Sequence, residues 1–174
     1  MEKREINLPE SERLKFREMS EKDLDFVHSM LSSPIVMKYY PKVFTADDSR
    51  QWILRQNLRY DAYGTGLWIA SDKKTEKPVG QMGLVFQTLS FGTELEIAYL
   101  LSPEYFKTGY AAEAAKCLKE FAFQKMGRKF VISIIRPENK ESRKVAERNG
   151  MSVWMEERFH GFSHLVYRAD PVLK

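Results

Sequence analysis

The residues best suited to chemistry lie in one stretch, Glu94–Glu113, which reads ELEIAYLLSPEYFKTGYAAE. An apolar strand pattern ends at Ser102, a short loop contains Gly109, and a helical pattern starts directly behind it. Such a connection points several backbone N–H groups and the positive end of a helix at one place, where a pyrophosphate can bind. Lys107 adds a positive side chain. Taken alone, the segment is also explained by an ordinary strand-loop-helix connection with a turn glycine.

The other potential nucleophiles and metal ligands are scattered along the chain. His28, His160 and His164 lie on separate predicted elements without the spacing of a metal-binding pair, so no metal site is expected. The single cysteine, Cys117, cannot form an internal disulfide or a cysteine zinc site. It lies inside a helical pattern beside Leu118, so we expect a buried or edge thiol rather than a nucleophile.

The elements that must position these residues follow from hydropathy patterning. Alternating or short apolar runs predict strands at Leu14–Arg17, Gly66–Ser71, Pro78–Phe86, Glu94–Leu101, Phe130–Ile135, Val153–Phe159 and His164–Arg168. Helical periodicity predicts helices at Leu24–Leu31, from Asp47 to about Tyr60, from Ala111 to about Lys125, and from an Asn139 cap to a Gly150 stop. This order predicts one α/β domain with a mixed sheet, in which Gly66 to Leu101 form three consecutive antiparallel strands.

Composition limits the class of protein further. The chain has 174 residues, of which 43% are apolar and 30% charged, as expected for one compact domain. The longest apolar run, Ile97–Leu101, is far too short to span a membrane, and Met1–Glu5 has no apolar stretch behind it that would make a secretory signal. We therefore expect a cytoplasmic protein without a membrane partner. The net charge of +4 is spread along the chain, so a nucleic-acid partner is not expected.

Several motifs in this order resemble the GNAT superfamily of acyl-CoA-dependent N-acetyltransferases, in particular its ribosomal-protein N-terminal acetyltransferase-like (RimJ/RimL-type) branch. The resemblance covers roughly Arg13 to Arg168, and its anchors are LKFREMSEKDLD, LWIA, PVGQMGL, EIAYLLSPEYFKTGYAAEA, RPENKESRKVAERNGM and FSHLVYR. It implies the GNAT fold, with a mixed central sheet of about six to seven strands flanked by about four helices. Residues 1–174 would then be a single acetyltransferase domain with its core at about 13–168.

The resemblance also implies where acetyl-CoA binds. Phe106 to Ala111 falls on the family's Q/R-x-x-G-x-G/A pyrophosphate loop, with Gly109 at the first glycine, and Lys107 stands where this branch usually has a glycine. The backbone from Tyr99 to Leu101 would hold the pantetheine arm, and the Asn139 side chain would contact the cofactor, cap the helix, or do both. The implied acetyl-CoA residues are Tyr99, Leu100, Leu101, Phe106, Lys107, Thr108, Gly109, Tyr110, Ala111, Ala112 and Asn139.

Two further residues are candidates for the proton transfers that amine acetylation requires. Glu96 shares a strand face with Glu94 and Ala98, and it would serve as general base if burial raised its pKa; the alternative is an exposed or structurally paired carboxylate. Ser142 lies one helical turn after Asn139, and the resemblance implies a general acid there. The alternative is a hydroxyl that only supports the start of the helix.

The expected activity is transfer of an acetyl group from acetyl-CoA to a primary amine, either a peptide N-terminus or a small-molecule amine, directly and without a metal. The rival hypothesis is a noncatalytic acyl-CoA-binding or sensing domain that has lost its base. A homodimer is also expected, because the β-rich end His164–Tyr167 completes the sheet in a fold of this type and related proteins often pair.

Overall fold

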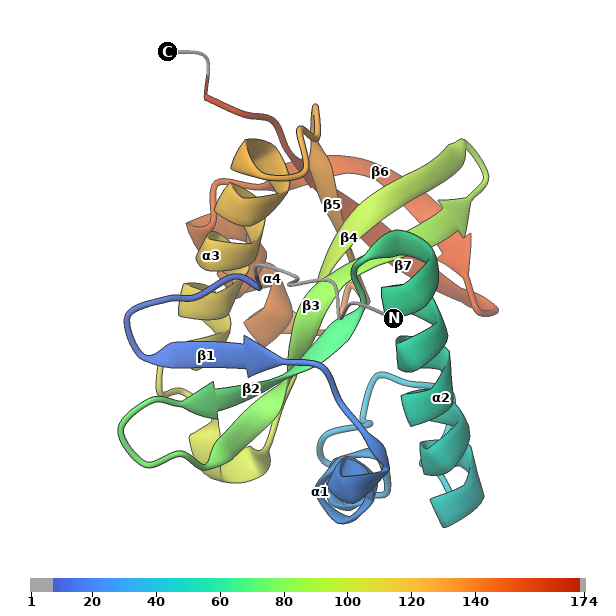
Figure 1. Cartoon of the computed structure of the whole chain (residues 1–174). Coiled ribbons are helices and arrows are strands. Elements are labelled where there is room, and N and C mark those ends of the chain that lie inside the picture. Colours follow the sequence, from blue (N-terminus) through green and yellow to red (C-terminus); the bar gives the residue numbers. More distant parts are fainter. Residues whose placement is uncertain (1–7, 173–174) are drawn as a thin grey trace.

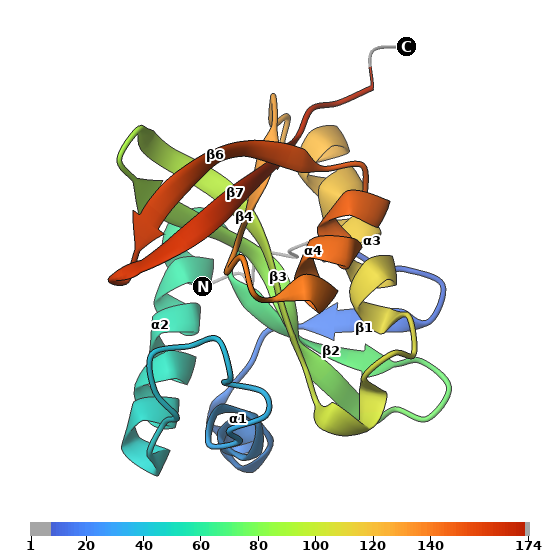
Figure 2. The same cartoon turned by 180° about the vertical axis from the view of Figure 1, so that it is seen from behind.

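The computed structural model describes residues 8–172, which form one sheet with helices on both faces (Figures 1 and 2). The strands are β1 Leu14–Arg17, β2 Leu67–Asp72, β3 Pro78–Leu89, β4 Gly92–Leu101, β5 Val131–Ile135, β6 Ser152–Phe159 and β7 Phe162–Ala169. The α-helices are α1 Leu24–Leu31, α2 Ala46–Tyr63, α3 Tyr110–Gln124 and α4 Lys140–Arg148, and short 3-10 turns occur at Glu21–Asp23 and Pro103–Tyr105. The predicted α/β class, seven-stranded mixed sheet and four helices are confirmed.

The sheet has the strand order β1-β2-β3-β4-β5-β7-β6. All neighbouring strands are antiparallel except β4 and β5, which are parallel and share only the pair Glu96 and Ile132. The predicted run of three antiparallel strands is therefore confirmed. The sequence suggested a longer loop through Gly92, but β3 and β4 continue until Leu89 pairs with Gly92, so that only Ser90 and Phe91 form the turn.

The two helix pairs cover opposite faces of the sheet (Figures 1 and 2). On one face, Trp52 of α2 donates a hydrogen bond from Nε1 to Gln81 Oε1 of β3 at 2.8 Å. On the other, the Tyr99 hydroxyl of β4 donates to the Ser142 carbonyl oxygen of α4 at 3.2 Å. Because side chains alternate along a strand, Glu96 lies on the α1–α2 face of β4 and Tyr99 on the α3–α4 face.

Local sequence accounts for the ends of α2. Thr45 accepts a hydrogen bond from Asp48 N, and the Asp48 side chain accepts one from Thr45 N, so both form a capping box. Gly64 ends the helix with φ of 70°, one turn later than the sequence predicted. Within residues 8–172, no helix is long and apolar enough to cross a membrane.

The core includes close backbone contacts that only glycine permits. At Gly83 of β3, an added Cβ would lie 1.9 Å from the Gly66 carbonyl oxygen, where no atom can fit. The surrounding side chains of β2 and β3, such as Trp68, Ile69 and Met82, are almost completely buried. The central strands are therefore fixed closely enough to hold a site built on β3 and β4.

Candidate active site

The candidate site lies where β4 and β5 end. Because these strands are parallel, their carboxyl ends lie at the same edge of the sheet, and each is followed by a helix N-terminus, that of α3 or of α4. Ladder pairing stops after one pair, and side chains satisfy the next backbone groups. The Ser133 hydroxyl donates to the Ile97 carbonyl oxygen at 3.0 Å. The strands thus open toward the end of the sheet that carries two helix N-termini.

The loop between β4 and α3 has the backbone shape of a glycine-rich turn. Lys107 and Gly109 both have left-handed backbones, with φ of 62° and 87°. Lys107 therefore adopts the conformation that the glycine usual at this position would favour, at a cost in backbone strain. Phe106, Lys107, Thr108 and Gly109 are all exposed, so the loop is open to a ligand.

The N-terminus of α3 is left uncapped. Its N-cap residue is Gly109, which has no side chain to bond the first helical N–H groups, and the first helical backbone bond runs from Glu113 N to Gly109 O at 3.0 Å. The N–H groups of Tyr110, Ala111 and Ala112 consequently lack partners within the helix. Helices α2 and α4 differ, because side chains of Thr45 and Asn139 cap them. Together with the helix dipole, the free N–H groups fit a pyrophosphate.

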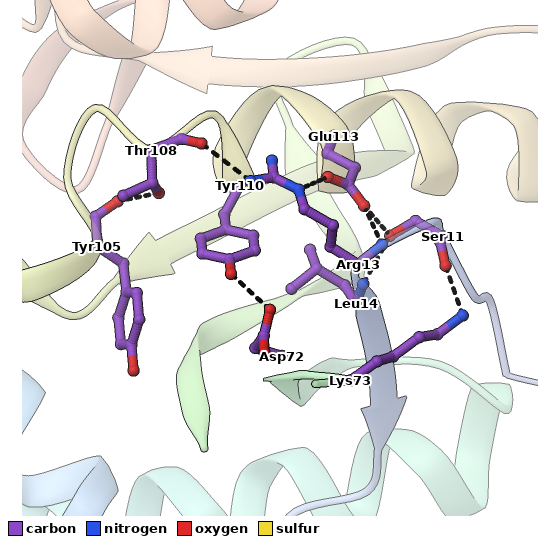
Figure 3. A network of polar contacts seen from close by, with 9 residues as sticks. All are labelled: Ser11, Arg13, Leu14, Asp72, Lys73, Tyr105, Thr108, Tyr110 and Glu113. Carbon is purple, nitrogen blue, oxygen red and sulfur yellow. Dashed lines mark hydrogen bonds and ion pairs between the residues drawn. The ribbon is translucent and has the colours of Figure 1, made fainter. Parts of the chain in front are cut away.

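A polar network holds this loop from the side of β1 (Figure 3). Arg13 donates from Nη1 to the Thr108 carbonyl oxygen at 3.2 Å and from Nε to Glu113 Oε2 at 2.6 Å. Its guanidinium lies 4.3 Å from the centre of the Tyr110 ring, a cation–π contact. One arginine thereby contacts the loop and the first turn of α3.

Tyr110 connects the same loop to the end of β2 (Figure 3). Its hydroxyl donates to Asp72 Oδ2 at 2.6 Å, and its ring meets the edge of Tyr105 at 5.8 Å. Asp72 also accepts backbone hydrogen bonds from Lys74 and Thr75. The bond from Tyr110, followed by those from the turn, lowers the pKa of Asp72 to about 2. The carboxylate is therefore charged at neutral pH.

Glu96 is the buried carboxyl group of the site. Only 8% of the residue is exposed, and each of its oxygens has a neutral donor. Gln87 Nε2 donates to Oε2 at 2.8 Å, and Ile134 N donates to Oε1 at 3.3 Å. Burial raises the pKa of Glu96 to about 7, although these two bonds and the charge of Arg59 favour the ionised form. The carboxyl group can therefore exchange a proton near neutral pH.

The charge of Arg59 acts on Glu96, and the charge of Glu96 in turn acts on two tyrosine hydroxyls. Tyr40 is 40% exposed, and partial burial together with the charge of Glu96 raises its pKa. Burial and Glu96 also raise the pKa of Tyr99. Arg59 of α2 is half-buried, and burial lowers its pKa. Both tyrosines are thus neutral hydrogen-bonding groups at physiological pH.

Asn139 and Ser142 lie together at the start of α4. Asn139 Oδ1 accepts a hydrogen bond from Ser142 N at 3.2 Å, so Asn139 is the N-cap of this helix. Within residues 8–172, neither Asn139 Nδ2 nor Ser142 Oγ has a hydrogen-bond partner. The Tyr99 hydroxyl contacts the Ser142 carbonyl oxygen, as described above. The structure therefore brings Ser142 close to Tyr99, and it shows no bond between Ser142 and Glu96.

The remaining candidates lie outside this arrangement. Cys117 is partly buried and donates to the Glu10 carbonyl oxygen at 3.3 Å, and burial raises the pKa of its thiol to about 11. It is therefore a protonated thiol and a poor nucleophile. In the described residues, no three His, Cys, Asp or Glu side chains gather as metal ligands would.

Sequence reasoning missed residues that the fold brings to the site from distant elements: Arg13, Gln87 and Arg59. Gln87 carried one usable signal, because strand pairing makes it the diagonal neighbour of Glu96 once Val85 is placed opposite Glu96. Arg13 carried none, since in the sequence it looks like the neighbouring basic residues of β1, Lys15 and Arg17.

The mixed sheet opens between its two parallel strands and has an uncapped helix N-terminus at the opening, a geometry suited to an enzyme whose cofactor carries phosphates. The GNAT acetyltransferase domain family matches residues 13–152 of this chain. The chain belongs to this family, and it is an acyl-CoA-dependent N-acetyltransferase.

Individual relatives agree with this assignment. The chain is 33% identical to the protein YkkB of Bacillus subtilis over 81% of this chain and 83% of that protein. It is 30% identical to the N-acetyltransferase YnaD of the same organism, over 81% and 80% of the two chains. The crystal structure of a GNAT-family acetyltransferase from Bacillus anthracis superimposes with a TM-score of 0.77 at 28% identity, over 93% of this chain and 97% of that one.

Proposed function

We propose that this enzyme transfers the acetyl group of acetyl-CoA directly to a primary amine, with Glu96 as general base. The observation that carries the proposal is a buried carboxyl group with a pKa of about 7 beside the opening between β4 and β5. Solved structures of the same fold include the RimL ribosomal L7/L12 acetyltransferase with coenzyme A and the Vibrio cholerae spermidine N-acetyltransferase with CoA and spermine.

The cofactor would bind along the α3–α4 face. The free N–H groups from Gly109 to Ala112 would hold the pyrophosphate, Phe106, Lys107 and Thr108 would border it, and the Lys107 charge would add attraction. The backbone from Tyr99 to Leu101 would bond the pantetheine arm in the manner of a strand. Support comes from the register, because β4 has no β5 partner beyond Glu96.

Acetylation of an amine needs a base and an acid, and we assign these roles to Glu96 and Ser142. The attacking amine must be neutral, so Glu96, directly or through water, takes a proton from the ammonium form. The nitrogen then forms a bond to the acetyl carbon, the carbon–sulfur bond breaks, and the departing sulfur takes a proton so that CoA leaves as a thiol. The group that donates this proton regains one from the nitrogen, which loses its second proton as the amide forms. Ser142 Oγ is proposed as the donor of the proton to sulfur, since this hydroxyl makes no hydrogen bond to any residue in the described part of the chain. Asn139 would contact the cofactor through its free amide nitrogen.

The acceptor is a peptide N-terminus or a small-molecule amine. The test is the release of CoA thiol from acetyl-CoA across a panel of peptides, amino sugars, polyamines and amino acids. Turnover on an amine, with the acetylated product identified by mass spectrometry, supports the proposal. Tight binding of acetyl-CoA without turnover on any class of amine would favour the noncatalytic binding or sensing domain.

The homodimer stays a prediction. Its structural support is the free edge of the sheet at β6, where Val153 and Trp154 are 49% and 42% exposed. Light scattering at micromolar concentration should report about twice the chain mass of 20.4 kDa, and a value near 20.4 kDa would contradict it.

A further inference from the structure

Arg13 lies immediately before β1 and contacts a loop that comes 95 residues later in the chain (Figure 3). We propose that Arg13 is a positioning residue for acetyl-CoA: it holds the pyrophosphate loop in its binding shape and neutralises the carboxylate of Glu113. The inference rests on the proposed acetyl-CoA site. The proposal means that acetyl-CoA binding depends on Arg13, a residue outside the loop sequence, as well as on the loop itself.

The first reason is that the loop's own hydrogen bonds tie it only to the preceding 3-10 turn. Phe106 to Gly109 is exposed and includes two left-handed residues. Its bonds to that turn run from Phe106 N at 3.2 Å, from Thr108 N at 3.4 Å and from the Thr108 hydroxyl at 2.5 Å. Arg13 Nη1 holds the Thr108 carbonyl oxygen from outside, which turns that carbonyl toward β1 and fixes the peptide plane of the next N–H group, that of Gly109.

The second reason is charge. Glu113 lies in the first turn of α3, where a carboxylate stabilises the helix but repels a second anion at the same N-terminus. Its pKa is lowered even though burial opposes ionisation, because Ser11 and Arg13 donate hydrogen bonds to it. The guanidinium of Arg13 balances this charge at 2.6 Å. With the pair intact, the N–H groups of α3 remain available to the phosphates.

The third reason is that Arg13 is itself held in place. Its guanidinium stacks on Tyr110, whose hydroxyl is fixed by Asp72. The backbone next to it is fixed as well, since Lys73 Nζ donates to the Ser11 carbonyl oxygen at 2.6 Å and Lys73 N donates to the Arg13 carbonyl oxygen at 2.8 Å. The start of β1, the turn after β2 and the cofactor loop thus form one connected network (Figure 3).

The matched control is Arg17, which lies on the same strand segment. It also forms an ion pair, with Asp23 at 2.5 Å, but this pair lies next to the 3-10 turn before α1 and away from the cofactor loop. Arg17→Ala should therefore lower thermal stability about as much as Arg13→Ala does. Only Arg13→Ala should affect the cofactor.

The experiment measures the dissociation constant of CoA by calorimetry and the KM values of both substrates. Arg13→Ala should weaken CoA binding about tenfold or more and raise the KM of acetyl-CoA, while the KM of the amine stays within twofold. Adding Glu113→Gln to Arg13→Ala should recover part of the affinity, because it removes the unbalanced carboxylate. Arg17→Ala should bind CoA like the wild type.

Several outcomes would overturn the inference without touching the proposed function. Wild-type CoA affinity in folded Arg13→Ala would do so, and so would an equal loss of affinity in Arg17→Ala. If Arg13→Ala does not fold, Arg13→Lys takes its place: lysine keeps the charge but cannot bond Thr108 and Glu113 together, so CoA binding should still weaken severalfold, and unchanged binding overturns the role. Failure of the wild-type protein to bind CoA would instead overturn the proposed function.

Discussion

The cofactor loop follows the carboxyl end of β4 and Glu96 lies in the middle of the same strand, but the two regions are built in opposite ways. The loop is exposed, contiguous in sequence and active through its backbone, with Gly109 leaving the α3 N-terminus open. Glu96 is buried, and its partners Gln87 and Ile134 come from other strands. Binding of an anion requires only correctly placed N–H groups, whereas a base near neutral pH requires removal from water by distant segments.

This difference predicts that substitutions near Glu96 lower turnover but spare CoA affinity, whereas substitutions in the loop weaken CoA binding. The largest effect is expected for Glu96→Gln, which keeps the shape of the side chain and removes its basicity. Turnover should fall about 10²- to 10⁴-fold, while CoA affinity stays nearly unchanged. The wild-type rate should rise as the pH increases through about 7, because only the ionised carboxylate accepts a proton.

The control for this variant is Glu94→Gln, on the same face of β4, where Glu94 pairs with Arg128 at 3.4 Å. It should retain turnover. Wild-type activity of Glu96→Gln from pH 6 to 9 would remove Glu96 as base and leave catalysis to positioning of the two substrates.

The next largest effect is expected at the loop. Acetyl-CoA at about 100 times its dissociation constant should stabilise the wild-type fold by about 2.7 kcal/mol. Gly109→Glu should abolish this stabilisation, because it strains a backbone with φ of 87° and places negative charge where the pyrophosphate belongs. The stabilisation is measured by thermal melting of the wild type and Gly109→Glu with and without acetyl-CoA.

Gly161→Glu is the matched control for backbone strain. Its φ is 83°, it lies in the turn between β6 and β7, and an added Cβ meets no atom within 4 Å. This variant should lose stability but keep its response to acetyl-CoA. An unchanged melting shift in Gly109→Glu would show that the loop does not bind the cofactor.

A smaller effect is expected when Gln87 is replaced. Gln87→Leu removes the donor at 2.8 Å that favours the ionised form of Glu96, so the pKa of Glu96 should rise above its value of about 7. Less carboxylate is then present at neutral pH, and the rate there should fall severalfold. At pH 9 to 10, Glu96 is ionised in both the wild type and Gln87→Leu, so their rates should converge. A variant that had lost its structure would stay slower at this pH. If the rate of Gln87→Leu were lower by the same factor at every pH, Gln87 would not act by lowering the pKa of Glu96.

The smallest effect is expected at Lys107. Lys107→Gly should relieve the left-handed strain at φ of 62° and stabilise the fold by about 0.5–1 kcal/mol, while CoA binding weakens a few-fold through loss of charge. Lys107→Ala removes the same charge but keeps the strain, so it should show the weaker binding alone. Equal melting temperatures of Lys107→Gly and Lys107→Ala would show that the left-handed backbone at this position is not strained.

The contrast between the regions also shows what sequence can predict. The elements were largely predictable because hydropathy periods, the Asn139 cap and the Gly150 stop are local signals. The strand-loop-helix connection around Gly109 was predictable for the same reason, whereas its role as a pyrophosphate loop came from the family resemblance and stays a prediction. The burial of Glu96 was not, since it depends on Gln87, on Ile134 and on the α1–α2 face covering β4. The role of Arg13 depends on strand order, which no local pattern of the β1 sequence contains.

The single pair that joins β4 to β5 has a consequence for how the chain folds as it leaves the ribosome. Strands β1 to β4 pair only with one another up to this point, and β5, β7 and β6 do the same beyond it. A nascent chain emerges at about 5–20 residues per second, so β1 to β4 leave the ribosome before Val131 emerges and can begin to pair first. The carboxyl-terminal half then docks where Glu96 pairs with Ile132 and where Ser133 and Ile134 bond β4, so the proposed base lies at the last junction of the sheet to form.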